Sequence, residues 1–567
     1  MSTEETRNEE ILLEADGVSV AFETDAGPTE VTRNVSFSVA RGQTVAIVGE
    51  SGSGKTATAM TILDLLPETG SRRGTMRYRG EDLFAASPER IRQLRGGEIS
   101  MIFQEPMTAF NPVYTVGRQI SDAIRSHRPM SRSAAFTEAI RLLEDVGIPE
   151  PRRRVRSYPH ELSGGQRQRA MIAMAIANDP VLLIADEPTT ALDVTVQADI
   201  LALLRRLQRD RGMGIVLITH DMGVVAEMAD RVVVMRKGDV VEEAEVHALF
   251  ASPSHEYTRA LLAAVPRASD GAQPQLDTRP GEPPKVGRAV AATAALEVDG
   301  LSVRYPGSTF RKGFLAVDDV SFSIPSGSVL ALVGESGSGK STIGKAIVGL
   351  AESTAGSIRI AGKDAARRSQ RREMRRSYAM VFQDPASSLN PRQTLGESIA
   401  EPFIVHRPEM RRAERERRVG DLLDKVELPA AWHTRYPHEL SGGQRQRIGI
   451  ARALALEPTL LIADEPTSAL DVSVQAAVLE LFRNLQRELG FSCLFISHDL
   501  AVVELLAADV AVLQGGKLVE LGATRQVLRS PRQDYTRRLV DAAPLPDPVA
   551  QRARAAKRDA SEAITAA

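Results

Sequence analysis

Two glycine-rich segments of this chain have the residue types and spacing needed to hold phosphate groups. GESGSGKT (Gly49–Thr56) and GESGSGKS (Gly334–Ser341) fit the pattern GxxxxGK[ST], and each lies between a short apolar run and a helical pattern. The glycines allow consecutive backbone N–H groups to turn toward phosphate oxygens, and the following helix N-terminus adds partial positive charge. A glycine-rich turn without a ligand is the alternative for a single match, but two complete matches favour phosphate binding. The residues predicted to form the two loops are Gly49, Ser51, Gly52, Ser53, Gly54, Lys55 and Thr56, and Gly334, Ser336, Gly337, Ser338, Gly339, Lys340, Ser341 and Thr342.

The end of each loop supplies a cation and a hydroxyl group. Lys55 and Lys340 are predicted to pair with β- and γ-phosphate oxygens. Thr56 and Ser341 are predicted to hold Mg²⁺ through their hydroxyls.

An Asp-Glu pair ends an all-apolar strand in each half of the chain. The aspartates, Asp186 and Asp464, are predicted to coordinate Mg²⁺ through water. The glutamates, Glu187 and Glu465, are predicted to polarise the attacking water. A helix-capping acidic pair is the alternative for either copy alone, and the neighbouring phosphate loop disfavours it.

A histidine and a glutamine complete each set of polar residues. His220 and His498 end the next strand, where an imidazole can hydrogen-bond a γ-phosphate and hold water and carboxylate in line. Gln104 and Gln383, in FQEP and FQDP, carry an amide that can reach Mg²⁺ and the attacking water. Alone, such a histidine is more often a surface or core residue, so its place in the series supports the predicted role.

These elements occur twice because the chain is duplicated. ELSGGQRQR, LIADEPT and the strand-ending histidine each return in the second half at one constant spacing. Short apolar β-branched runs alternate with helical patterns in both halves, which indicates an α/β core with a largely parallel sheet. The Arg-rich segment Val116–Val155 is predicted to form a separate helical lobe.

Changes of composition mark the borders of the two halves. The Pro- and Gly-rich segment between them has no helical or strand periodicity, which is typical of a linker. The predicted parts are a disordered N-terminus (1–10), a first domain (11–264), a linker (265–295), a second domain (296–543) and a flexible tail with a weakly helical end (544–567).

Charge and cysteine content exclude several classes of protein. The 567 residues carry a net charge of −2, which argues against a non-specific nucleic-acid binder. The single cysteine, Cys493, cannot form an internal disulfide or a four-thiolate metal site, and it fits a reducing compartment. The sequence shows no secretory signal and no run near the ~20 apolar residues that cross a bilayer. We therefore expect any membrane role to require a partner.

LSGGQRQR, at Leu162–Arg169 and Leu440–Arg447, is the most specific motif in the chain. Together with the preceding motifs it resembles the ATP-binding cassette superfamily over nearly all of residues 11–545. The resemblance implies two tandem P-loop NTPase domains, each a RecA-like α/β core with a helical subdomain and an antiparallel β subdomain. It also implies ATP and Mg²⁺ as ligands, and hydrolysis at two sites because both halves retain every element.

The resemblance further implies that the two cassettes pair within one chain and that each signature caps the ATP of the other. One nucleotide would lie between Lys55 and Ser441–Gly443, and the second between Lys340 and Ser163–Gly165. The residues that the family assigns to the caps are Ser163, Gly164, Gly165 and Gln166, and Ser441, Gly442, Gly443 and Gln444. The family stacks an aromatic on adenine at Phe22 and Tyr305, and Asp193 and Asp471 match its loop between the two sites.

Three features are similar to the importer ATPases for peptides, nickel and glutathione. They are YPHELSGGQRQR, the Asn-Pro pair after each FQ segment, and the extension SPSHEYTRALLAAVP (Ser252–Pro266), which Ser530–Val540 echoes in the second half. This likeness implies docking under two integral-membrane permease subunits, whose coupling helices enter beside Gln104 and Gln383. It implies a peripheral protein on the cytoplasmic face of the inner membrane, supplied by an extracytoplasmic substrate-binding protein. Dipeptides, longer peptides, glutathione-like thiols and nickel chelates are all left open as cargo.

Two other tandem-cassette classes fit less well. Soluble translation ATPases join their cassettes through a long charged hairpin, whereas this linker is short and Pro-rich; a fused sugar-importer ATPase lacks the peptide-type extension.

Many relatives carry a cysteine cluster after the Pro-Pro element, which this chain lacks, so no iron–sulfur cluster or zinc is predicted. The clusters Arg152–Arg154 and Arg367–Arg376 could contact anionic lipid, although a solvated helix face is the favoured interpretation.

Overall fold

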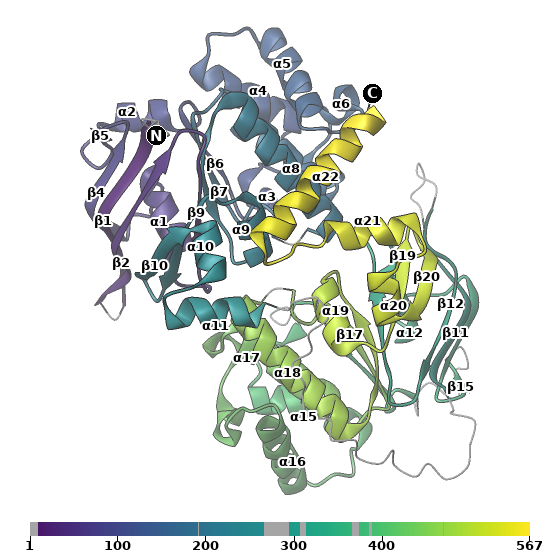
Figure 1. Cartoon of the computed structure of the whole chain (residues 1–567). Coiled ribbons are helices and arrows are strands. Elements are labelled where there is room, and N and C mark those ends of the chain that lie inside the picture. The colour runs from purple at the N-terminus through teal and green to yellow at the C-terminus, as the bar shows by residue number, and fades with distance from the viewer. Residues whose placement is uncertain are drawn as a thin grey trace. The chain divides into compact units, whose positions relative to one another are not determined.

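The computed structural model describes the chain as two units. The first comprises Met1–Leu192, Val196–Val265 and Pro544–Ala567, and the second Asp193–Thr195 and Pro266–Ala543 (Figure 1). The residues described are 10–25, 27–190, 192–265, 294–306, 313–365, 374–384, 388–468 and 470–566. Most of the predicted disordered N-terminus and of the predicted linker therefore lies outside the described residues, as does most of Arg367–Arg376.

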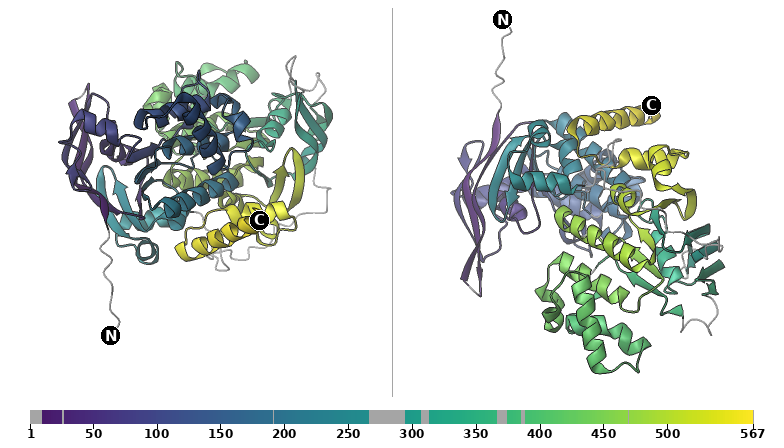
Figure 2. Two further views of the ribbon diagram at one scale, coloured as in Figure 1. Left: turned by 90° about the horizontal axis from the view of Figure 1, so that it is seen from above. Right: turned by 60° about the horizontal axis from the view of Figure 1, so that its bottom comes forward.

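A ten-stranded sheet, ordered β5-β4-β1-β2-β10-β9-β3-β8-β7-β6, forms the centre of the first unit. Strands β9, β3, β8, β7 and β6 run parallel to one another, whereas β1 pairs antiparallel with β2 and β4. Every residue of β3, β7 and β8 is buried, as expected for central parallel strands covered on both faces. Figure 2 shows the purple N-terminal strands at one side of this unit. The strands are β1 (Ile11–Thr24), β2 (Gly27–Ala40), β3 (Thr44–Val48), β4 (Gly70–Tyr78), β5 (Glu81–Asp82), β6 (Ile99–Ile102), β7 (Leu182–Asp186), β8 (Gly214–Ile218), β9 (Arg231–Arg236) and β10 (Asp239–Glu245).

Helices follow most of these strands. The segment predicted to be a helical lobe contains α4, α5 and α6, but its apolar side chains share one hydrophobic cluster with those of α7 and α8. The lobe is therefore helical, as predicted, and it packs on the core through a common apolar interior. The helices of the first unit are α1 (Lys55–Ile62), α2 (Pro88–Leu94), α3 (Pro106–Ala109), α4 (Val116–His127), α5 (Arg132–Asp145), α6 (Pro151–Arg154), α7 (Gly164–Ala175), α8 (Val194–Arg211), α9 (Met222–Met228), α10 (Val246–Ala251), α11 (Glu256–Ala264) and α22 (Pro548–Ala566), with the 3₁₀ turn η1 (Pro159–Glu161).

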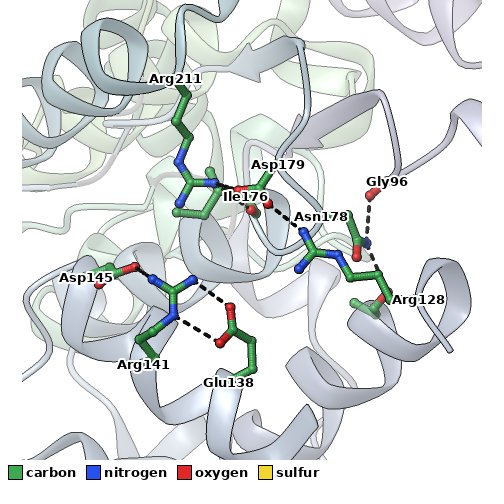
Figure 3. Close-up of polar contacts among 10 residues, drawn as sticks. Gly96, Arg128, Glu138, Arg141, Asp145, Ile176, Asn178, Asp179 and Arg211 are labelled. Carbon is green, nitrogen blue, oxygen red and sulfur yellow. Dashed lines mark hydrogen bonds and ion pairs between the residues drawn. The ribbon is translucent and has the colours of Figure 1, made fainter. Parts of the chain in front are cut away.

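Polar contacts also tie the helical lobe to the turn between α7 and β7 (Figure 3). The Asp179 carboxylate accepts hydrogen bonds from Arg128, which follows α4, at 2.6 Å, and from Arg211 at the end of α8. The amide of Asn178 donates to Gly96 O at 2.9 Å and to Ala123 O at 3.1 Å. Because β7 ends at Asp186, these contacts connect the lobe to the strand that supplies the first Asp-Glu pair.

The second unit repeats this plan. Its parallel strands β16, β17, β18, β13 and β19 form a sheet with antiparallel β20, and β12-β11-β14-β15 form a separate antiparallel sheet. The strands are β11 (Ala294–Tyr305), β12 (Phe314–Pro325), β13 (Val329–Val333), β14 (Ala355–Ile360), β15 (Lys363–Asp364), β16 (Tyr378–Val381), β17 (Leu460–Asp464), β18 (Ser492–Ile496), β19 (Asp509–Gln514) and β20 (Lys517–Ala523). The helices are α12 (Lys340–Ile347), α15 (Leu395–His406), α16 (Arg412–Lys425), α17 (Gly442–Leu454), α18 (Val472–Leu489), α19 (Leu500–Leu506), α20 (Thr524–Arg529) and α21 (Asp534–Ala542), with the 3₁₀ turns η2 (Ala430–Thr434) and η3 (Pro437–Glu439). Among the helices described in either unit, none is both long and apolar enough to cross a membrane.

The predicted flexible tail at 544–567 is corrected by the structure. Residues 548–566 form the helix α22, which belongs to the first unit and packs on α9 and α10 (Figure 1). Its first turn is fixed by Asp547, whose carboxylate accepts the backbone N–H groups of Val549 and Ala550. The sequence predicted only a weakly helical stretch because the packing surface lies on α9, in a distant part of the sequence.

Glu227 of α9 is the centre of that packing. Its side chain is 1% exposed and accepts hydrogen bonds from Arg205 of α8, from Gln551 Nε2 at 2.5 Å and from Arg558 Nη2 at 3.0 Å. Arg205 also donates to Asp559 of α22 at 3.0 Å. Three groups of α22 thus converge on one buried ion-pair network in the first unit.

Glu227→Ala is expected to lower the stability of the first unit and to release α22. Removing one partner of a buried ion pair costs roughly 3–5 kcal/mol, because the remaining guanidinium groups of Arg205 and Arg558 lose their shared carboxylate. Thermal unfolding of the full chain and protease cleavage near Pro544 measure the two effects. Leu505→Ala is the matched control, since Leu505 holds the equivalent position in the second half and is 47% exposed. Equal effects of the two variants would contradict the assignment.

Candidate active sites

The order of the parallel strands brings the predicted site residues of each unit together. In the first unit the glycine loop follows β3, His220 follows β8, Glu187 follows β7 and Gln104 follows β6. These strands are neighbours and run in the same direction, so their carboxyl ends lie along one edge of the sheet. Ligands of open α/β sheets bind at this edge. The second unit has the same order, β16-β17-β18-β13.

Each glycine loop is a tight turn of backbone around its lysine. Lys55 Nζ donates to Gly49 O at 2.7 Å and to Glu50 O at 2.8 Å, and Lys340 does the same with Gly334 O and Glu335 O at 2.7 and 2.8 Å. Gly54 precedes α1 with a φ of 95°, and a Cβ there would lie 2.2 Å from Thr32 Cγ2. A side chain at Gly54 is therefore excluded both by the backbone and by space. A closely wound loop with a buried ammonium group at a helix N-terminus suits a polyphosphate.

The hydroxyl and the aspartate predicted to hold Mg²⁺ lie side by side in each unit. Thr56 Oγ1 is 3.2 Å from Asp186 Oδ1, and Ser341 Oγ is 3.0 Å from Asp464 Oδ1. A hydroxyl and a carboxylate are hard oxygen ligands, and Mg²⁺ is commonly held by one or two such groups together with phosphate and water. Within the described residues no cluster of three His, Cys, Asp or Glu side chains forms a metal site. The residues present thus fit a magnesium ion that arrives with a nucleotide.

Glutamate, glutamine and histidine form a hydrogen-bonded triad in each unit. Glu187 Oε2 accepts from Gln104 Nε2 at 3.0 Å, and its Oε1 lies 3.1 Å from His220 Nδ1. In the second unit Glu465 Oε2 accepts from Gln383 Nε2 at 2.9 Å and lies 3.3 Å from His498 Nδ1. The two units therefore assemble the three side chains in nearly the same way.

Both glutamates occupy unusual backbone positions. Glu187 has a φ of 46° and Glu465 a φ of 44°, which is the left-handed region. Such a conformation costs a non-glycine residue on the order of 1 kcal/mol and persists where the surroundings fix it. Here the Glu187 N–H donates to Ile218 O at 2.9 Å, and the Glu465 N–H to Ile496 O at 3.0 Å. The strained turn directs each carboxylate toward the glutamine and the histidine of the same unit.

The two carboxylates of each Asp-Glu pair have opposite pKa shifts. Burial raises the pKa of Asp186 to about 6, against the effect of the hydrogen bond from Thr56, and burial likewise raises the pKa of Asp464. Burial would also raise the pKa of Glu187, but the hydrogen bond and charge of His220, with the hydroxyl of Thr190, outweigh it and lower the pKa to about 2. The pKa of Glu465 is lowered in the same way by His498. Each glutamate is therefore an anion at neutral pH, while the buried aspartate binds a proton more readily.

Asp186→Asn is expected to stabilise the ligand-free protein near pH 7.5. The folded pKa of about 6 lies above the ordinary value of 3.8, so the folded state holds the extra proton and the free energy of unfolding falls as pH rises from about 4 to 6. Above that range the buried charge costs at most about 3 kcal/mol, which the asparagine removes. Denaturant unfolding at pH 4.5 and 7.5 measures the difference between variant and wild type. Asp210→Asn, at an exposed position, is the control; a difference for Asp186→Asn that is equal at both pH values would contradict the account.

Comparisons with known proteins identify the family. A family model described as "ABC transporter" matches residues 32–190 and 317–468, which together exceed half of the chain. The chain belongs to the ABC transporter family. A second model, "Oligopeptide/dipeptide transporter, C-terminal region", matches residues 241–292 and 519–566 of this ABC protein. The resemblance found in the sequence and the predicted tandem-cassette fold are thus confirmed, and the chain is an ABC-type ATPase.

Several relatives are similar along nearly the whole chain. The glutathione import ATP-binding protein GsiA of Pectobacterium atrosepticum is 48% identical over 568 residues, which cover 95% of this chain and 90% of that protein. GsiA of Escherichia coli K12 is 46% identical over 571 residues, covering 95% and 91%. Among solved structures, cbiO1 of Clostridium perfringens, part of the ABC transporter complex cbiONQ, is 27% identical with a TM-score of 0.38 and covers 42% of this chain and 92% of that one. A dimer of the ATP-binding cassette MJ0796 with ADP and Pi is 29% identical with a TM-score of 0.37, covering 41% and 99%.

The signature residues of this ABC protein lie at helix N-termini. Ser163 caps α7 by accepting from Gln166 N at 3.3 Å, and Ser441 caps α17 by accepting from Gln444 N at 3.3 Å. A Cβ at Gly165 would lie 2.6 Å from Val196 Cγ1, and one at Gly443 would lie 2.2 Å from Val474 Cγ1. Glycine is therefore needed at these two positions, where α8 approaches α7 and α18 approaches α17. The serine hydroxyl and the first N–H groups of each signature helix lie together at the helix N-terminus.

The residues predicted to stack on adenine lie on strands, whereas those predicted for the loop between the two sites lie before helices. Phe22 and Tyr305 lie toward the ends of the antiparallel strands β1 and β11, and Tyr305 is 41% exposed. Asp193 accepts from the Ser336 N–H at 3.1 Å, and both residues belong to the second unit. Asp471 is the N-cap residue of α18. The adenine role and the inter-site role stay predictions.

The sequence analysis missed two kinds of site residue. Thr190 donates to Glu187 Oε2 at 2.8 Å, and a tyrosine from the extension contacts each glycine loop. Thr190 is one of many hydroxyl residues in the chain, and no sequence signal separates it from them. The sequence does contain a signal for the tyrosines, because Tyr257 and Tyr535 hold equivalent positions in the two copies of the extension motif.

Proposed function

We propose that this ABC protein is the ATP-hydrolysing, energy-coupling subunit of a bacterial importer for glutathione, peptides or related small solutes. The observation that carries the proposal is the likeness to glutathione import ATP-binding proteins along 95% of the chain. The match of the oligopeptide/dipeptide transporter region in both halves supports the same class. These likenesses disfavour the two alternatives, a translation ATPase and a fused sugar-importer ATPase.

Both nucleotide sites are proposed to be competent. In each unit the lysine and the loop N–H groups bind the phosphates, the hydroxyl and the aspartate hold Mg²⁺, and the glutamate orients water and takes up its proton. When bound, Mg²⁺ offsets charge on the β- and γ-phosphate oxygens. The triads support this assignment, because the glutamine amide and the histidine fix both oxygens of Glu187. The hydrogen bond and the charge of His220 lower the pKa of Glu187, so the Glu187 carboxylate is ionised at neutral pH.

The partners follow from the proposed class. The chain is proposed to dock on two integral-membrane permease subunits at the cytoplasmic face of the inner membrane, with coupling helices beside Gln104 and Gln383. Cargo is proposed to come from an extracytoplasmic binding protein. Capping of each nucleotide by the signature of the other cassette stays part of the proposal.

Reconstitution with the permease subunits tests the proposed cargo class. The genes for the membrane partners and the binding protein are co-expressed with this chain, and the complex is placed in liposomes. Binding protein loaded with glutathione or a dipeptide is expected to raise ATP hydrolysis and to drive uptake of the labelled solute. Stimulation only by a loaded sugar-binding protein, or no copurification with permease subunits, would overturn the proposal.

A further inference from the structure

A tyrosine from the extension after each cassette reaches the glycine loop of that cassette. The phenol oxygen of Tyr257, on α11, accepts the backbone N–H of Glu50 at 3.1 Å. The phenol oxygen of Tyr535, on α21, accepts the backbone N–H of Glu335 at 3.1 Å. Both side chains are buried, with exposed fractions of 6% and 5%. The same contact has formed twice in one chain.

The contacted residue also holds the phosphate-binding lysine. Glu50 O accepts Lys55 Nζ at 2.8 Å and Ser53 N at 3.2 Å. In the second unit Glu335 O accepts Lys340 Nζ at 2.8 Å and Ser338 N at 3.1 Å. The tyrosine and the lysine thus fix the N–H and the C=O of a single loop residue. Without the phenol oxygen, the N–H of Glu50 or Glu335 would lose this acceptor. The same residue, whose carbonyl positions the lysine, would then be held less firmly.

A carboxylate on a strand of each unit, β10 or β20, fixes the start of the helix that carries the tyrosine. Glu242 of β10 accepts the N–H groups of Ser254 and His255 at 2.7 and 3.0 Å, directly before α11. Glu520 of β20 accepts those of Arg532 and Gln533 at 3.0 and 3.2 Å, directly before α21. The start of the helix that carries each tyrosine is therefore fixed to a core strand by two hydrogen bonds.

The surroundings of the two tyrosines differ while the loop contact is the same. His255 accepts the Tyr257 N–H at 3.1 Å, and Arg236 lies 5.0 Å from the Tyr257 ring. Gln533 and Gln514 occupy the equivalent positions in the second half. Two polar residues beside the tyrosine therefore differ between the halves, whereas the hydrogen bond from the loop N–H to the phenol oxygen is present in both.

We propose that Tyr257 and Tyr535 are positioning residues of the nucleotide sites, which hold the start of each glycine loop and its lysine ready for the phosphates. Both lie within the segments that match the oligopeptide/dipeptide transporter C-terminal region, so this region takes part in nucleotide binding. The inference rests on phosphate binding by the glycine loops and is independent of the cargo and the permease partners.

The test is the double variant Tyr257→Phe/Tyr535→Phe in the full chain. Phenylalanine keeps the ring and removes only the oxygen, so a non-hydrolysable ATP analogue is expected to bind roughly 5- to 10-fold more weakly. Hydrogen exchange of the ligand-free protein is expected to be faster in the peptides that contain Gly49–Thr56 and Gly334–Ser341. Both measurements use the purified chain without transport partners, so failure of the importer assignment would leave them unchanged.

A packing variant of the same helix supplies the control. Leu261 is buried in α11 at 4% exposed, and Leu261→Ala is expected to lower the melting temperature while leaving analogue affinity within twofold of wild type. Wild-type affinity and wild-type loop exchange in the double phenylalanine variant would overturn the proposal. Equal loss of affinity in Leu261→Ala would also overturn it, because general destabilisation would then explain the effect.

Discussion

Replacing both Glu187 and Glu465 by glutamine is expected to lower ATP turnover by roughly 10²- to 10³-fold while ATP still binds. Each glutamate is an anion at neutral pH, because the neighbouring histidine and hydroxyl lower its pKa against the effect of burial. Glutamine keeps the shape and one acceptor oxygen, but it can neither take up a proton from water nor accept on two oxygens. The lysine and the glycine loop, which hold the phosphates, are positioned by hydrogen bonds to the loop backbone, and these are unchanged by the substitution. Binding and turnover are therefore expected to separate.

Steady-state phosphate release and equilibrium binding of ATP measure these two quantities. Each single variant is expected to retain at most about half of the wild-type rate if the sites act independently, and less if they are coupled. Glu144→Gln, on the exposed face of α5, is the control for a lost surface charge. Near-normal turnover in either single variant would show that the altered site does not contribute to hydrolysis.

The sequence predicted which side chains lie together at each candidate site, because short local patterns encode the strands that carry them. A run such as LLIAD specifies a buried strand, and the residue after such a strand lies at the carboxyl edge of a parallel sheet. Glu187, His220 and Gln104 are therefore neighbours once the strand order is known, and duplication supplied a second copy of every pattern. The strained φ of Glu187 and the hydrogen bond from Thr190 could not be predicted, since both depend on how the strand ends pack.

The C-terminal segments show where sequence reasoning fails. Residues 544–567 have the composition of a tail, yet α22 is held by Glu227, which no local pattern connects with Arg558. Tyr257 was part of a recognised motif, which gave no indication of a contact with the glycine loop. Its phenol contact with Glu50 joins segments that lie far apart in the sequence. Contacts of this kind follow from the tertiary fold, and a single sequence contains no periodicity that signals them.

Lys340→Ala is expected to abolish nucleotide binding at the second site at concentrations that saturate the wild type. The ammonium group is buried, with its residue 5% exposed, and burial lowers its pKa. It donates to backbone carbonyls and, at 3.5 Å, to the Ser338 hydroxyl, which are neutral acceptors. A phosphate oxygen is a charged acceptor, and each charge-assisted hydrogen bond contributes roughly 1.5–3 kcal/mol, or about 10- to 100-fold in affinity.

The number of ATP analogue molecules bound per chain measures the loss at Lys340. Wild type is expected to bind two and Lys340→Ala one, and Lys55→Ala is expected to give the reciprocal result at the first site. Lys345→Ala, an exposed lysine of the same helix α12, keeps the loop contacts and is expected to bind two. If Lys340→Ala bound two molecules with wild-type affinity, the glycine loop would hold its ligand through backbone N–H groups alone. The lysine would then serve only to brace the loop through Gly334 O and Glu335 O, and the phosphate contact assigned to it would be wrong.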